Sequence, residues 1–116
     1  MKKAVILTYG CQMNKHDSEV IAGLLNEIGF DCFDKLIPSP DLILINTCAV
    51  RQNAENRALG RLGEMKQFKD KNPDLIIGLC GCVAQELGGK LLDRAEFLDF
   101  VIGPADIHNI NEIVLS

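Results

Sequence analysis

The sequence predicts an α/β protein with a three-layer, flavodoxin-like fold, built on a five-stranded parallel sheet of order 2-1-3-4-5. Two observations support this prediction. Short apolar runs alternate with segments of helical periodicity along the chain, which is the pattern of consecutive βα units. The middle runs are apolar throughout, as in parallel strands that helices cover on both faces. The strand order is that of the simplest small fold with right-handed crossovers that agrees with both observations.

The first βαβ unit is expected near the amino terminus. Residues Ala4–Thr8 form its apolar first strand. The next segment carries an apolar helical stripe and ends at Gly29, which suits a left-handed C-terminal cap. The stripe consists of Val20, Ile21, Leu24, Leu25 and Ile28. Phe30–Asp34 alternates apolar and charged residues and is expected to be an edge strand.

The remaining elements continue the alternation after a turn at Pro38–Pro40. In chain order they are a strand at Leu42–Ile45, a helix at Asn53–Lys71, a strand at Leu75–Leu79, a helix at about Gln85–Ala95, a strand at Phe100–Ile102 and a last helix with Ile107, Ile110, Ile113 and Val114 facing inward. Gly88 and Gly89 weaken the prediction of the fourth of these six elements, because glycine disfavours a helix interior.

Length and charge limit what this chain does alone. Its 116 residues fit one domain, residues 1–116, with one core. No apolar run approaches the roughly 20 residues that a bilayer requires, so we expect a cytoplasmic protein with no membrane partner. The 12 basic and 16 acidic residues give a net charge of -4, which does not favour binding of a nucleic-acid backbone. Any nucleic acid would therefore be held by another domain.

The five cysteines indicate metal binding or thiol chemistry, because their number is odd and no signal-peptide pattern is present. Cys11, Cys48 and Cys82 follow the first, third and fourth predicted strands, which are neighbours in the expected sheet. Their thiols should therefore meet at its carboxyl edge. Cys32 is expected to be a packed core-type residue. In Cys80-Gly81-Cys82, Cys80 ends an apolar run and should face inward, whereas Gly81 allows the turn that frees Cys82.

Three thiolates could hold zinc, copper(I) or an iron–sulfur cluster. A structural zinc site uses four ligands, and His16 could supply the fourth, although its position suits a surface histidine. Three thiolates also suit a [4Fe–4S] cluster with one open iron, whose sulfurs could accept hydrogen bonds from Lys15 and Arg51. Two alternatives stay open: a zinc-binding interaction module, and a thiol redox or sensor domain in which two cysteines form a reversible disulfide.

Three stretches resemble the amino-terminal domain of the methylthiotransferases, which are radical S-adenosylmethionine enzymes. They are TYGCQMN at 8–14, NTCAVR at 46–51 and GCVAQ at 81–85. Asp17-Ser18-Glu19 and Gly103-Pro104 also lie where that family has them, so the likeness spans nearly the whole chain. The resemblance implies that Cys11, Cys48 and Cys82 bind the auxiliary [4Fe–4S] cluster, whose open iron carries the sulfur or methylthio group.

Within the family, Arg51 and the following Ala54-Glu55 resemble the corresponding residues of one branch. That branch adds a methylthio group to C2 of N6-isopentenyladenosine in tRNA. Other branches act on threonylcarbamoyladenosine in tRNA or on a ribosomal-protein aspartate. The resemblance also implies a radical domain, which binds S-adenosylmethionine and a second [4Fe–4S] cluster, and an RNA-binding domain. Neither is present, so we expect an excised domain without catalytic residues of its own, which reaches tRNA only through those partner domains.

Overall fold

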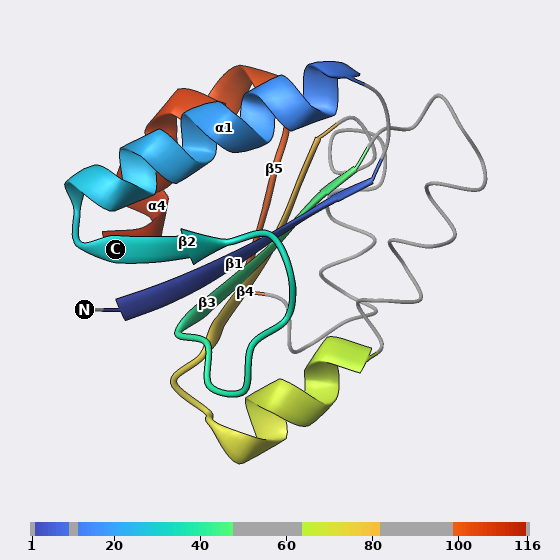
Figure 1. The fold of residues 1–116 in the computed structure, drawn as a ribbon, viewed down its shortest axis with the longest axis vertical. Coiled ribbons are helices and arrows are strands. Elements are labelled where there is room, and N and C mark those ends of the chain that lie inside the picture. The colour runs from blue at the N-terminus through green and yellow to red at the C-terminus, as the bar shows by residue number, and fades with distance from the viewer. Residues whose placement is uncertain (1, 10–11, 48–63, 82–98, 116) are drawn as a thin grey trace.

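The computed structural model describes residues 2–9, 12–47, 64–81 and 99–115 (Figure 1). Their elements are β1 (Lys2–Tyr9), α1 (Gln12–Glu27), β2 (Phe30–Phe33), β3 (Leu42–Thr47), β4 (Ile76–Gly81), β5 (Phe100–Ile102), a 3-10 helix η1 (Pro104–Asn109) and α4 (Ile110–Leu115). Residues 64–71 are also helical and form the end of the long helix predicted at 53–71. The predicted helix at 85–95 lies outside the described residues.

The strands form one sheet of order β2-β1-β3-β4-β5, and every neighbouring pair is parallel. This confirms the predicted flavodoxin-like topology. β3 extends past its apolar run to Thr47, and β4 runs to Gly81, because backbone pairing continues where side-chain hydrophobicity stops. β1 is similarly longer at both ends than its apolar run, while β2 ends at Phe33, one residue early.

Helices cover both faces of the sheet (Figure 1). On one face, α1, η1 and α4 pack on alternate strand residues such as Ile6 and Leu44. On the other face, Met65 of the helix at 64–71 packs on the intervening residues, including Leu7 and Ile45. Ile21 and Leu25 of α1 are fully buried, and the rest of the predicted stripe is half-buried. The three-layer prediction is therefore confirmed for the described part of the chain.

Local sequence sets where α1 ends and how the last helical segment is divided. Gly29 closes α1 with φ = 97°, and its N–H donates to the Asn26 carbonyl, so the predicted left-handed cap is confirmed. The predicted last helix is instead two elements, η1 and α4. Ile107 and Ile110 are both buried, because a 3-10 helix with about three residues per turn puts residues three apart on one side.

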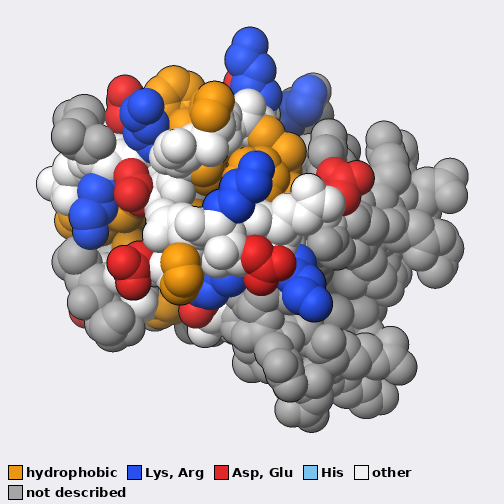
Figure 2. Space-filling view, turned by 90° about the horizontal axis from the view of Figure 1, so that it is seen from below, with side chains coloured by type: hydrophobic (Ala, Val, Ile, Leu, Met, Phe, Trp, Pro, Cys, Tyr) orange, Lys and Arg blue, Asp and Glu red, His pale blue; other side chains and the backbone are white. Residues whose placement is uncertain are grey.

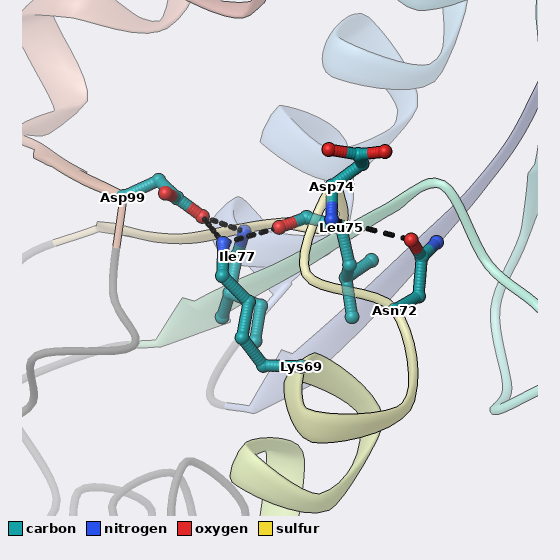
Figure 3. A network of polar contacts seen from close by, with 6 residues as sticks. All are labelled: Lys69, Asn72, Asp74, Leu75, Ile77 and Asp99. Carbon is teal, nitrogen blue, oxygen red and sulfur yellow. Dashed lines mark hydrogen bonds and ion pairs between the residues drawn. The ribbon is translucent and has the colours of Figure 1, made fainter.

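A polar network fixes the start of β4 (Figure 3). Lys69 Nζ donates to the Leu75 carbonyl and lies 2.7 Å from Asp99 Oδ2. The same carboxylate oxygen accepts the Ile77 N–H at 2.8 Å, and the Asp99 N–H donates to the Ile77 carbonyl at 2.7 Å. Asn72 Oδ1 accepts the Asp74 N–H at 3.2 Å and shapes the turn between helix and strand. The network thus joins the helix at 64–71 to β4 and to the entry of β5.

Replacing Asp99 by alanine should lower the free energy of unfolding by about 2 kcal/mol, because the N–H of fully buried Ile77 loses its acceptor. Asp99→Asn keeps an acceptor oxygen and should lose about half as much. Chemical denaturation of both variants measures these differences. Asp74→Ala, at an exposed side chain on the adjacent turn, is the matched control and should change stability by less than about 0.5 kcal/mol. Equal effects for Asp99→Ala and the control would contradict the role of the network.

Candidate metal centre

The carboxyl ends of three neighbouring strands lie level with one another. Tyr9 of β1 is the register partner of Thr47 of β3, and Thr47 is the partner of Gly81 of β4. In the sequence, Cys48 and Cys82 follow Thr47 and Gly81 directly, and Cys11 follows Tyr9 by two residues. Cys11, Cys48 and Cys82 themselves lie outside the described residues. The backbone positions from which their segments leave the sheet are nevertheless adjacent.

A row of side chains capable of hydrogen bonding crosses the sheet one position earlier. Thr8, Asn46 and Cys80 are register partners on three successive strands, on the face that α1 covers. Ser18 of α1 bridges the first two: its Oγ lies 2.7 Å from Thr8 Oγ1 and accepts a hydrogen bond of 3.0 Å from Asn46 Nδ2. Asn46 is fully buried, so this contact satisfies a donor that would otherwise be costly to desolvate. We call Thr8, Ser18 and Asn46 the Ser18 network.

The two described cysteines are not poised as ligands. Cys80 is fully buried, as predicted, and burial raises the pKa of its thiol far above the ordinary value, with the Asp17 carboxylate raising it further. Cys32 is half-buried rather than fully enclosed; it packs against the core on the α1 face, and its Sγ lies 3.7 Å from the Ala22 carbonyl oxygen. Burial, and then the Asp31 charge, raise the pKa of this thiol too. Both groups are therefore neutral thiols near pH 7.

The other residues predicted to contribute to a metal centre lie either at the surface or outside the described residues. His16 is exposed, as a surface histidine should be, and Lys15 is exposed at the rim of a groove of about 650 Å³ between α1, β1 and β2. Arg51 lies outside the described residues. Among the residues that the structure describes, no group of three or more His, Cys, Asp or Glu side chains could hold a metal ion. A metal centre at this edge would thus depend on the three undescribed cysteines.

Alkylation tests whether the Cys80 thiol is buried. In the folded, metal-free chain, Cys80 should resist iodoacetamide at pH 8, because it is fully buried and its pKa is raised. It should react within minutes once the chain is unfolded in guanidinium chloride. Peptide mass spectrometry measures both rates. Rapid modification of Cys80 in the folded chain would show that the β4 end is open and that the interior position assigned to this thiol is wrong.

The fold places the protein in the class of flavodoxin-like α/β domains. In its sequence, one cysteine follows each of the strands β1, β3 and β4 within two residues. Residues 3–103 match the model of the family described as "Uncharacterized protein family UPF0004". The chain belongs to this family, which forms the amino-terminal domain of the methylthiotransferases. Within the described ranges, no helix has the length and hydrophobicity needed to span a membrane.

Curated relatives carry the same domain within much longer proteins. The chain is 46% identical over 115 residues to a protein of Oceanobacillus iheyensis and 44% identical to one of Bacillus subtilis, each alignment covering 97% of this chain. Both relatives are named tRNA-2-methylthio-N(6)-dimethylallyladenosine synthase. The chain spans only 22% of the length of either relative, about a fifth.

Proposed function

We propose that this domain holds a [4Fe–4S] cluster through Cys11, Cys48 and Cys82, at the carboxyl edge of the sheet. The observation that carries the proposal is the level ending of β1, β3 and β4. Neighbouring strands lie about 4.8 Å apart and consecutive Cα atoms about 3.8 Å apart, so each cysteine starts one or two residues from adjacent strand ends. Such starting points allow three thiolates to reach one cluster with short loops.

The chemistry of the donor set fits this group. Thiolates are the usual ligands of iron–sulfur clusters, and three of them leave one iron open to an outside ligand. Cys11 immediately precedes Gln12, the first residue of α1, where the partial positive charge of a helix amino terminus favours a thiolate and an anionic cluster. Cys80 is fully buried in the core on the α1 face, which favours Cys82 over Cys80 as the third ligand. When bound, the cluster would supply the sulfur or methylthio group, and Cys11, Cys48 and Cys82 would hold it.

The names of the relatives extend the proposal to the whole enzyme. We infer that residues 1–116 are one domain of a tRNA methylthiotransferase that adds a methylthio group to C2 of dimethylallyl (isopentenyl) adenosine in tRNA, in the cytoplasm. The remaining length of the relatives leaves room for a radical domain with S-adenosylmethionine and a second [4Fe–4S] cluster, and for an RNA-binding domain. Figure 2 shows basic and acidic side chains interspersed on the described part of one face. Because a nucleic-acid backbone favours a basic surface, this supports assigning RNA binding to another domain.

Anaerobic reconstitution of the chain with iron and sulfide tests the proposal. We expect a brown protein with about four irons and four sulfides per chain. Three results would contradict it: a colourless protein after reconstitution, one zinc per chain that survives exposure to air, or a specific two-proton mass loss that reductant reverses. The second would indicate a zinc module, and the third a thiol redox domain. The mass measurement must start from reconstituted protein, because thiols of a metal-free sample oxidise in air.

A further inference from the structure

The Ser18 network ties together two of the strands from which the proposed ligands leave the sheet. Thr8 lies three residues before Cys11, and Asn46 lies two residues before Cys48. One hydroxyl, Ser18 Oγ, contacts both side chains, at 2.7 Å and 3.0 Å. Since Asn46 Nδ2 donates to this oxygen, the hydroxyl hydrogen of Ser18 remains able to bond Thr8 Oγ1, which can also act as the donor. The network therefore links β1, β3 and α1 at one point.

The fully buried Asn46 is not a residue that stability alone favours at its position, whereas Thr8 and Ser18 are half-buried and line the groove between α1, β1 and β2. Earlier residues on the same face of the same strands are apolar: Ile6 precedes Thr8 by two, and Leu44 precedes Asn46 by two. An apolar residue in place of Asn46 would continue the core, and replacing buried polar partners by apolar groups of similar shape is often neutral or stabilising. Thr8 and Asn46 are the last residues on this face of β1 and β3 before the segments that carry Cys11 and Cys48. This coincidence indicates a role in holding those segments rather than in folding the core.

We propose that Ser18 is a positioning residue, which fixes the carboxyl ends of β1 and β3 against α1 so that Cys11 and Cys48 are presented to the same cluster. The inference rests on the proposed function. Fixing both strand ends in the metal-free chain would hold the starting points of the two ligand segments near the place where the cluster would bind, and so would lower the entropy cost of binding. Register pairing of Asn46 with Cys80 extends the constraint to β4, from which Cys82 follows.

The test compares two substitutions on α1 that should destabilise the metal-free chain about equally but differ in their effect on the cluster. Ser18→Ala removes both hydrogen bonds and takes this acceptor from the fully buried Asn46 amide, and the gain in helix propensity offsets only part of that cost, so Tm should fall by about 4 °C. Ile21→Val, one turn later at a fully buried position, should lower Tm by about 4 °C without touching the network. Release of iron to a chelator from the reconstituted chain, measured well below either Tm, should be about tenfold faster for Ser18→Ala and unchanged for Ile21→Val.

Two further variants control the chemistry of the position. Ser18→Thr keeps the hydroxyl and should restore slow iron release. Thr8→Val removes one of the two hydroxyl contacts at nearly constant volume and should give an intermediate rate, so the test does not depend on one variant that fails to fold. Equal release from Ser18→Ala and Ile21→Val, with a fully loaded wild type, would overturn this inference and leave the proposed function standing. A wild-type chain that takes up no cluster would overturn the proposed function, and this inference with it.

Discussion

Replacing Cys48 or Cys82 by alanine is expected to abolish the cluster in the reconstituted chain, and Cys11→Ala should do the same. Each thiolate is one of only three protein ligands in the proposed site, so a variant keeps two, which are too few to retain a [4Fe–4S] cluster. Iron and sulfide should fall from about four each to near zero, and the brown absorption should be lost. Chemical analysis and the visible spectrum measure the loss.

Cys80→Ala is the matched control, because Cys80 is two residues from Cys82 but is fully buried with a raised pKa. It should retain the full cluster, with some loss of stability from the small cavity. Cys32→Ala, on β2 at the edge of the sheet, should also retain it. A Cys80→Ala chain without iron beside a Cys82→Ala chain with a complete cluster would reverse the assignment of the two thiols.

Introducing a β-branched side chain at Gly78 should destabilise the fold more than any substitution discussed above. Gly78 is buried in β4 and is the register partner of Phe100 in β5, whose ring covers it. A Cβ added there would overlap Cζ and Cε2 of the ring and lie only 2.6 Å from Cε1. Phe100 would have to leave its position over the sheet. We expect Gly78→Val to lower the free energy of unfolding by about 3 kcal/mol, and Gly78→Ala by less.

The effect depends on the ring, so it should be smaller in a Phe100→Leu background, and a double-mutant cycle by urea denaturation measures this coupling. Gly23→Ala is the glycine control. Gly23 is exposed on α1 with nothing within 4 Å of the added Cβ, and its replacement should stabilise the helix by up to about 1 kcal/mol. Unchanged stability of Gly78→Val would mean that the packing of Phe100 on β4 is wrong.

The strands and helices were predictable because their determinants are local, and the strand order because it is that of the simplest small fold with right-handed crossovers. Continuous apolar runs such as Leu42–Ile45 identify buried parallel strands, and Gly29 with its positive φ marks the end of α1. Strand ends were less predictable, because backbone pairing carries β3 through Asn46 and Thr47, whose side chains are polar. The 3-10 geometry of η1 was not predicted, since a spacing of three between Ile107 and Ile110 fits either kind of helix.

The cysteines alone predicted the candidate site, but the Ser18 network beneath it was not predicted. The sequence indicated that three cysteines follow neighbouring strands, and the level ends of those strands agree with that expectation. Asp17-Ser18-Glu19 contributed to the family resemblance, but no role for Ser18 could be predicted, because its contacts are made with residues 10 and 28 positions away and depend on how α1 crosses the sheet. Asn46 gave one usable signal: an amide directly after an apolar strand, at a position that alternation assigns to the interior.

The most direct test of the central claim is a crystal structure of the anaerobically reconstituted chain, with anomalous data collected at the iron edge. We predict one compact group of iron peaks just beyond Tyr9, Thr47 and Gly81, within bonding distance of the sulfurs of Cys11, Cys48 and Cys82. Iron density elsewhere, or these three sulfurs rigidly packed on opposite faces of the sheet, would contradict the account.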